Sequence, residues 1–149
     1  MSGYQEIIDG ELGSSCRGKI NTQNQKIFNY DNLRLPIIDG QGFAITTGLK
    51  NGGFEVPYAC VIVGVRIFSD LSCSAVIDLW KDVYANYPPT DADSITASAP
   101  PILTTAVKNQ DTGLTGWTKT LAKGDIIYQN VDSNDNAKRL QVILDVQRS

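Results

Sequence analysis

Two neighbouring stretches, "YACVIVGVRIFS" at residues 58–69 and "SAVIDLWKDVY" at residues 74–84, indicate the fold class of this chain. Side chains of a β-strand alternate between the two faces of the sheet, so a hydrophobic period of two marks a half-buried strand. In the second stretch Ile77 and Leu79 share one face, opposite Asp78, Trp80, Asp82 and Tyr84. In the first stretch the period sets Val61, Val63, Val65 and Ile67 against Ile62, Gly64, Arg66 and Phe68. We therefore predict two adjacent strands.

The same pattern continues to the C-terminus. "KRLQVILDVQ" at residues 138–147 predicts a half-buried antiparallel strand. Weaker strands are predicted at residues 34–38, 42–47, 53–57, 116–121 and 125–131, separated by turn sequences such as "DGQG", "KNGG" and "AKGD". About eight short strands without a helix predict an all-β antiparallel β-sandwich, for which the jelly roll is the commonest eight-strand form.

Residues 1–32 have a different composition, polar and rich in Asn, Gln, Gly and Ser. Leu12, Cys16, Ile20 and Ile27 are spaced to form one thin apolar stripe on a helix that Ser14 or Ser15 could cap. Such a stripe is too narrow to fold alone, so we expect packing against a partner or a symmetry mate. A disordered or extended arm is the alternative. The predicted domains are an N-terminal segment, 1–32, and a sandwich, 33–149.

Charge and hydropathy exclude two classes of partner. The 149 residues include 13 Lys and Arg and 16 Asp and Glu, a net charge of -3, with no basic cluster that could follow a phosphate backbone. Nucleic acid is therefore not an expected partner. The longest apolar runs, such as "ACVIVGV", fall well short of the ~20 residues needed to cross a bilayer. We expect a protein made in the cytoplasm, with no membrane partner.

Cysteine and histidine usage bears on the chemistry. The three cysteines form no metal-binding motif, and the chain has no histidine. Cys60 and Cys73 are predicted to be buried thiols that act as small hydrophobic side chains. A disulfide between them is the alternative. The commonest general base is missing, so we predict no enzyme activity, no metal centre and no cofactor.

The stretch "WKDVYANYPPTDADSI", residues 80–95, concentrates carboxylates. Asp78 and Asp82 would stand about 13 Å apart along a strand, beyond the roughly 5–9.5 Å of a glycosidase pair. Asp82, Asp91 and Asp93 could instead bind calcium, or could accept hydrogen bonds from backbone N–H groups of their own loop. "VDSNDN", residues 131–136, imitates the start of an EF-hand loop but has Ile143 in place of the final Glu, so we predict a plain hairpin turn.

Three aromatic side chains, Trp80, Tyr84 and Tyr87, occupy the same stretch. They could form a sugar-stacking platform. Alternatively, Trp80 and Tyr84 cover one face of the sheet or pack against another subunit, with the phenol groups reaching water or a polar neighbour.

The run from Val56 to Ser133 resembles a β-rich module of tailed-bacteriophage structural proteins, especially tail fibres and other virion appendages. The similarity lies in the opening "PYAC", the strand "VIDLWKD", the loop "YANYPPT", the segment "SIT" and a late "WT" before "GD".

A second resemblance concerns "GELGSSCRGKIN", Gly10–Asn21, which is similar to a motif near the start of phage fibre and appendage proteins. Cys16 stands where that motif often has Ala. The resemblance implies that the matching residues help attach the chain to the virion; besides two glycines they are Glu11, Arg17, Lys19, Ile20 and Asn21.

Together the resemblances imply a non-enzymatic virion protein made in a bacterial host: a capsid decoration or cement protein, or a short surface fibre. The expected partners are two further copies in a homotrimer and another virion protein, the major capsid or a tail protein. The alternative is a tail-fibre module that recognises host-surface glycan through Trp80, Tyr84 and Tyr87.

Overall fold

The computed structural model describes residues 29–149. The chain divides into two compact units after Tyr30, and the second runs from Asp31 to Ser149. The predicted N-terminal helix or arm lies outside the described residues, and so do the predicted attachment residues Glu11, Arg17, Lys19, Ile20 and Asn21.

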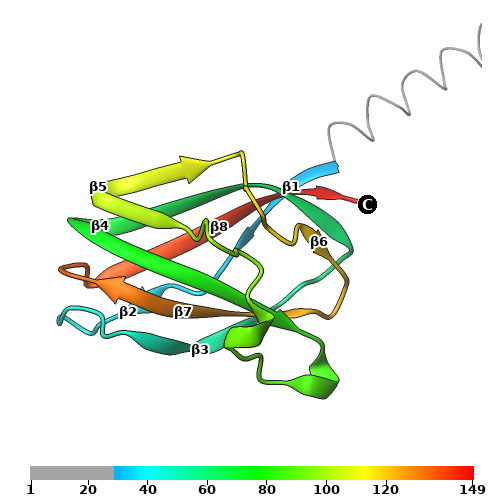
Figure 1. Cartoon of the computed structure of the whole chain (residues 1–149), viewed down its shortest axis with the longest axis horizontal. Coiled ribbons are helices and arrows are strands. Elements are labelled where there is room, and N and C mark those ends of the chain that lie inside the picture. Colours follow the sequence, from blue (N-terminus) through cyan, green and yellow to red (C-terminus); the bar gives the residue numbers. More distant parts are fainter. Residues whose placement is uncertain (1–28) are drawn as a thin grey trace, which may run out of the picture. The chain divides into compact units, whose positions relative to one another are not determined.

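The described chain is an antiparallel sheet curled into a half-barrel (Figure 1). Its strands follow the order β1-β8-β4-β7-β3, with β2 beside β8, and with β5 and β6 beside β4. This confirms the predicted all-β antiparallel class, while the jelly-roll topology stays a prediction. The strands are β1 (Tyr30–Arg34), β2 (Ile38–Asp39), β3 (Gly48–Glu55), β4 (Cys60–Asp82), β5 (Ile102–Asp111), β6 (Thr120–Leu121), β7 (Ile126–Asn134) and β8 (Arg139–Arg148).

The two adjacent strands expected at residues 58–69 and 74–84 are one strand, β4, of 23 residues. Its first half, 60–69, pairs with β8, and its second half, 75–82, pairs with β7. Between them β4 bends and doubles back (Figure 1). We call the two resulting walls the β8 layer, with β1 and the first half of β4, and the β7 layer, with β3 and the second half. β5 bends in the same place and pairs with both halves of β4.

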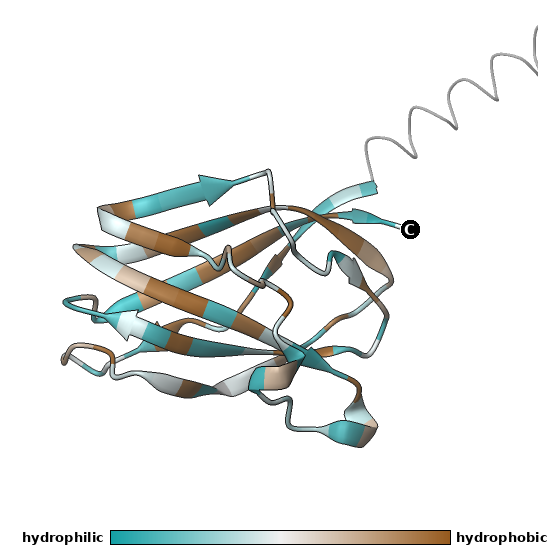
Figure 2. Cartoon of the chain, in the orientation of Figure 1, coloured by the Kyte–Doolittle hydropathy of each residue, from teal (hydrophilic) through white to brown (hydrophobic). Residues whose placement is uncertain are grey.

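Both halves of β4 face one hydrophobic core. Ile62 and Ile67 come from the first half and Ile77 and Leu79 from the second, each at most 2% exposed. Apolar stretches run along the same strands in Figure 2. Burying such side chains stabilises the fold by about 1.5–3 kcal/mol each, so the bend is held by the core that it encloses.

Several strand predictions need correction. The register of β4 shifts between Ile62 and Gly64, so the core face passes from even to odd residues and the predicted faces of residues 61–68 hold only from Val65 onward. Residues 42–47 form no strand, and of the strands predicted at 34–38 and 116–121 only residues 34, 38 and 120–121 are strand. β5 was not predicted, because an edge strand exposed on both faces lacks hydrophobic alternation.

At one end of the half-barrel, which we call the chain-entry end, β1 starts and β8 finishes (Figure 1). Asp31 accepts hydrogen bonds from the Tyr58 hydroxyl (2.7 Å) and from an Arg148 guanidinium nitrogen (2.9 Å). The guanidinium carbon of Arg148 also lies 4.0 Å from the centre of the Tyr58 ring, as in a cation–π contact. These three residues, the entry clasp, tie the start of β1 to the end of β8 and to the segment that leads into β4.

The opposite end, which we call the hairpin end, holds the bend of β4 and the β7–β8 turn. Asp70 accepts hydrogen bonds from the backbone N–H groups of Lys138 and Arg139, both at 3.0 Å. Asp135 accepts one from the backbone N–H of Ser74 at 2.9 Å. The predicted hairpin turn before the last strand is present, but of "VDSNDN" only Asp135 and Asn136 lie in it, because Val131–Asn134 belong to β7. The Asp135 side chain also fastens the bend of β4.

The entry clasp predicts a pH dependence of stability. Hydrogen bonds from Tyr58, then from Arg148, lower the pKa of Asp31 from 3.8 to about 2. Because the folded pKa lies below the unfolded one, the clasp stabilises the fold fully above pH 4 and loses this effect as the pH falls through about 2. Asp31→Asn should lower the urea midpoint at pH 6, and its difference from wild type should shrink between pH 4 and pH 2.

Tyr58→Phe serves as the matched variant, since it removes the donor of the shorter hydrogen bond to Asp31 but keeps a ring beneath Arg148. The urea midpoint of Tyr58→Phe should lie closer to that of wild type than the urea midpoint of Asp31→Asn does. A constant difference between wild type and Asp31→Asn over this pH range would contradict the role given to Asp31.

Candidate functional site

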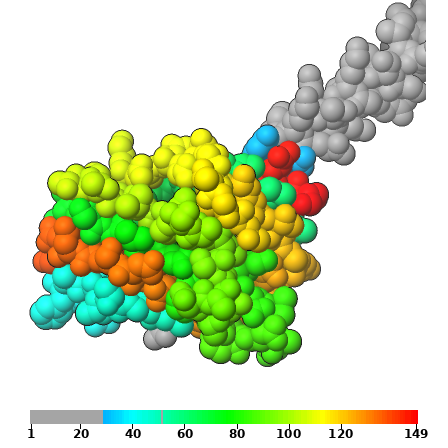
Figure 3. All heavy atoms as spheres, viewed as in Figure 1, coloured from blue at the N-terminus to red at the C-terminus, as the bar shows by residue number. Residues whose placement is uncertain are grey.

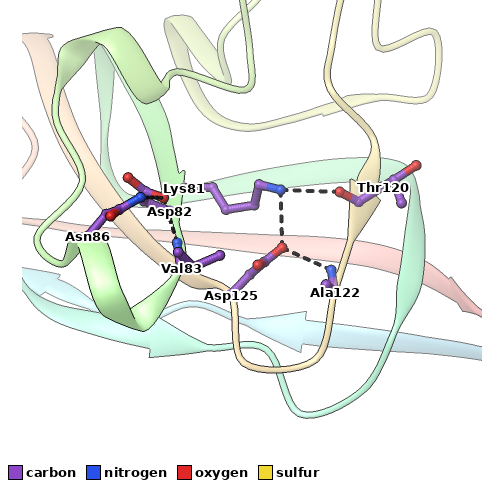
Figure 4. Close-up of polar contacts among 7 residues, drawn as sticks. All are labelled: Lys81, Asp82, Val83, Asn86, Thr120, Ala122 and Asp125. Carbon is purple, nitrogen blue, oxygen red and sulfur yellow. Dashed lines mark hydrogen bonds and ion pairs between the residues drawn. The ribbon is translucent and has the colours of Figure 1, made fainter.

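The candidate site is the loop that follows β4, residues 83–99, with two short 3-10 helices, η1 (Tyr84–Asn86) and η2 (Asp91–Asp93). Asp82, at the end of β4, starts the loop. Its carboxylate accepts hydrogen bonds from the backbone N–H of Val83 (2.7 Å) and the side-chain amide of Asn86 (3.2 Å) (Figure 4). Because Asp82 satisfies these two donors, the chain leaves the sheet here and turns into η1.

The second helix is held by its own cap. The Asp93 carboxylate accepts hydrogen bonds from the backbone N–H (2.7 Å) and the hydroxyl (2.9 Å) of Thr90, which completes a capping box. Within residues 29–149, no three His, Cys, Asp or Glu side chains gather closely enough to hold a metal ion. The structure thus does not gather Asp82, Asp91 and Asp93 into the three-carboxylate group that the calcium alternative describes. Asp82 and Asp93 instead accept hydrogen bonds from loop backbone groups, as the other interpretation predicted.

Asp78 joins the loop to the sheet. Its carboxylate accepts hydrogen bonds from the indole N–H of Trp80 (2.8 Å), the backbone N–H of Leu79 (2.8 Å) and the hydroxyls of Ser94 (2.7 Å) and Thr96 (2.5 Å). The residue is only 8% exposed. A buried carboxylate is stable when several donors replace its lost water, so four donors let Asp78 stay buried beneath the loop.

The end of the loop then runs beside β4. The backbone N–H of Ile95 donates to the carbonyl of Leu79 (2.9 Å), and Ser94 forms an isolated antiparallel bridge with Trp80. Ile95 is 3% exposed and belongs to the core. The loop is thus fixed at both ends, and in the space-filling view its green to yellow-green atoms form a continuous surface at the lower right (Figure 3).

An aromatic group lies under the middle of the loop. The hydroxyls of Tyr87 and Tyr128 are hydrogen bonded to each other, and their ring centres are 5.5 Å apart. Tyr128 lies opposite Trp80 in the β4–β7 pairing, so these two side chains are neighbours on the outer face of the β7 layer. Gly53 of β3 leaves room for Tyr128, because a Cβ there would lie 3.0 Å from its ring.

The three predicted aromatic residues therefore have different environments. Trp80 is half-buried, and its N–H is bound to Asp78. Tyr87 is 49% exposed and leans on Tyr128, whereas Tyr84 is 83% exposed. Tyr84 does not share a strand face with Trp80, because β4 ends at Asp82. The structure brings Trp80 and Tyr87 to one group through Tyr128 and leaves Tyr84 at the surface of η1.

Sequence analysis missed Tyr128, Ser94 and Thr96. Ser94 and Thr96 lie 16 and 18 residues from Asp78, and the Tyr128 partnership depends on the register of β4 against β7. The alternation in residues 125–131 could have placed Tyr128 on the outer face, but no sequence signal pairs it with Trp80.

The neighbouring side chain, Lys81, secures the base of the loop from the other side. Its ammonium group lies 3.1 Å from the carboxylate of Asp125 and 3.5 Å from the carbonyl of Thr120 (Figure 4). Asp125 is 4% exposed and also accepts the backbone N–H of Ala122 at 2.9 Å. This buried ion pair connects the end of β4 with β6 and the start of β7, so the loop begins from a fixed position.

The cysteine prediction can be tested directly. Cys60 and Cys73 are free thiols, 0% and 2% exposed, at the start of β4 and beyond its bend. Burial raises the pKa of the Cys60 thiol. They act as buried apolar side chains, as predicted, and the disulfide alternative is wrong for this structure.

Comparisons with protein-family models, curated proteins and solved structures find no match to this chain. Among the described residues, none of the helices has the length and apolar character needed to span a membrane. The site presents Tyr84 and Tyr87 on a loop held by Asp78, Asp82 and Lys81, which is suited to contact with another molecule.

Removing the carboxylate of Asp78 tests this description of the site. Asp78→Ala leaves the indole N–H of Trp80 and the hydroxyls of Ser94 and Thr96 without their acceptor, and we expect a loss of about 3 kcal/mol in the free energy of unfolding. The loop should also become the first site of limited proteolysis. Urea unfolding and mass spectrometry of the early fragments measure both effects.

Asp91→Ala is the matched control, because Asp91 is exposed and lies in the same loop. It should change the free energy of unfolding by no more than about 0.5 kcal/mol. Equal losses in the two variants would show that Asp78 has no special part in holding the loop.

Proposed function

We propose that this chain is a non-enzymatic structural protein of a bacteriophage virion, a capsid decoration or cement protein or a short surface fibre. Residues 1–32 attach it to the particle and the β domain projects from that attachment. The supporting observation is the entry clasp, in which Asp31, Tyr58 and Arg148 join the start of β1 to the rest of the sheet. A force on the N-terminal segment would pass directly into several strands.

The end of β8 lies at the same end of the domain as the start of β1. Arg148 belongs to the entry clasp and pairs with Cys60, so β8 finishes at the end of the domain where the chain enters (Figure 1). The hairpin end, whose turns are fastened by Asp70 and Asp135, would then point away from the particle. We propose a homotrimer as the assembled form and a major capsid or tail protein as the attachment partner.

The number of copies of this chain in each particle depends on the attachment partner. Counting the copies therefore distinguishes a capsid decoration protein from a fibre on the tail. Quantitative mass spectrometry of purified particles should find the chain at a level comparable with the major capsid protein. A small fixed number of copies that co-purifies with isolated tails would remove the decoration role. Absence of the chain from purified particles would end the whole proposal.

A second candidate function is recognition of host-surface glycan by the loop. The observation in its favour is the pair Tyr84 and Tyr87, 83% and 49% exposed, on a loop whose ends are fixed to the sheet. Exposed aromatic rings with a fixed backbone can stack on sugar rings without first being ordered. Trp80 supports this surface from below rather than contacting the ligand, because its N–H is already bound to Asp78.

Tyr84→Ala tests the glycan function without disturbing the fold, because Tyr84 packs little of its surface. Particles carrying it should adsorb to host cells at least about tenfold more slowly, the effect of losing roughly 1.4 kcal/mol of contact energy at each site. Val83→Ala, an exposed apolar neighbour, is the control and should adsorb normally. Unchanged adsorption by both Tyr84→Ala and Tyr87→Ala would exclude this loop as the glycan site.

A further inference from the structure

A hollow of about 380 Å³ lies on the outer face of the sheet, where β5 runs beside the first half of β4. In the antiparallel pairing Arg66 lies opposite Gln110, and Phe68 lies opposite Lys108. These four side chains point away from the core, because the residue between the two on β4, Ile67, is a core residue. The lining of the hollow consists of Arg66, Phe68, Lys108, Asn109 and Gln110.

Two cations occupy diagonal corners of this hollow. Arg66 and Lys108 are diagonal neighbours on adjacent strands, so their backbone positions are about 7–8 Å apart. Charge-assisted hydrogen bonds from Arg or Lys to an anion are ~2.8 Å long. Two long basic side chains at this separation can therefore both bind one anionic group placed between them.

Asp145 leaves part of this positive charge uncompensated. Its carboxylate accepts a hydrogen bond from one guanidinium nitrogen of Arg66 at 2.8 Å, and it comes from β8, on the other side of β4 from the hollow. The buried Nε of Arg66 has no hydrogen-bond partner among residues 29–149. Lys108 forms no ion pair within the same residues. One positive charge is thus in excess here, on a chain whose net charge is -3.

The backbone around the hollow is held in place. The side chain of Asn109 accepts the backbone N–H of Gln110 and donates to the carbonyl of Ile102, both at 2.9 Å, so it ties together the two limbs of the bent β5. Phe68 is half-buried, and Arg66 is oriented by its ion pair with Asp145. A ligand would meet a largely preformed site, which lowers the entropy cost of binding.

The chemistry of the lining specifies a ligand. The two cations favour one carboxylate, the Phe68 ring offers an apolar surface, and the carboxamide of Gln110 can both donate to and accept from hydroxyl groups. A sugar ring that carries a carboxylate presents all three kinds of group. We propose that this hollow binds an acidic sugar of the uronic-acid class, with its carboxylate between Arg66 and Lys108 and its ring against Phe68. The volume lies at the low end of the roughly 300–1,000 Å³ of small-molecule sites.

A polyanion such as a nucleic acid fits this surface less well. Binding a phosphate backbone takes a basic stripe that neutralises several charges in succession. The hollow has one positive charge in excess, and the net charge of the whole chain is negative. A ligand with one carboxylate on an otherwise neutral ring matches that balance.

The sugar site is separate from the loop after β4. Its residues belong to the first half of β4 and to β5, whereas Tyr84 and Tyr87 follow the second half of β4. The inference goes beyond the proposed structural role, because it gives the β domain a ligand of its own. It is tested on the purified chain, so its failure leaves the copy-number measurement on particles unaffected.

Titration of the ¹⁵N-labelled full-length chain with sodium glucuronate tests the proposal. The amide shifts in NMR spectra should concentrate in residues 66–68 and 108–110, with a dissociation constant of roughly 1 mM for so small a ligand. Glucose has the ring without the carboxylate, and acetate has the carboxylate without the ring. Each should bind at least about tenfold more weakly than glucuronate.

Variants of Lys108 identify the charge that is responsible. Lys108→Gln alters an exposed side chain and should raise the dissociation constant for glucuronate about tenfold, whereas Lys108→Arg keeps the charge and should bind nearly as wild type. Lys123→Gln removes the same charge from an exposed lysine that does not line the hollow, and should leave the affinity unchanged.

Four results would overturn the proposal. One is a spectrum that stays unchanged at glucuronate concentrations about fiftyfold above the expected dissociation constant. Acetate that binds as tightly as glucuronate would show a site for any carboxylate, without recognition of the ring. Glucose that binds as tightly would show that the carboxylate is not recognised. Equal affinity of Lys108→Gln and wild type would place the ligand elsewhere.

Discussion

The structure depends on the continuity of β4 through both layers. A single strand of 23 residues pairs with β8 in its first half and with β7 in its second, so neither layer can shift without moving the other. The bend between the halves is an irregular piece of backbone whose polar groups need partners. Asp135 binds the backbone N–H of Ser74 beside the bend, and Asp70, in the bend itself, binds the backbone N–H groups of Lys138 and Arg139 at the start of β8. The shared core and these carboxylates together make the bend a stable element.

The loop after β4 follows from the same constraint. Because the second half of β4 is fixed by the core, Asp78 and Asp82 leave it in fixed directions, and each organises a different part of the loop. A buried carboxylate that loses its donors is costly, so the arrangement of Ser94, Thr96 and Trp80 around Asp78 is restricted to one geometry. Because the loop is fixed, the backbone that carries Tyr84 and Tyr87 is also held in place. They are presented to solvent without the entropy loss that a mobile loop would suffer on binding.

The two ends of the domain have different physical roles in the proposals. The entry clasp receives the N-terminal segment and links it to β8 and β4, whereas the hairpin end is closed by side chains that bind turns. β5 has an unpaired edge in the described sheet, as β1 and β3 also have.

The sequence by itself determined the class of the fold. Period-two alternation in residues 74–80 and 139–146 survives in the structure because a buried face tolerates no shift of register. It also predicted a hairpin turn before the last strand, the buried thiols, and carboxylates of the loop that bind its own backbone. It did not reveal β5, whose exposed faces carry no alternation, or the shift at Ile62–Gly64, which is an irregularity of backbone pairing. Only the tertiary structure joined Asp78 to Ser94 and Thr96, and Trp80 to Tyr128, because the register between strands far apart in the sequence is set by how the whole core packs.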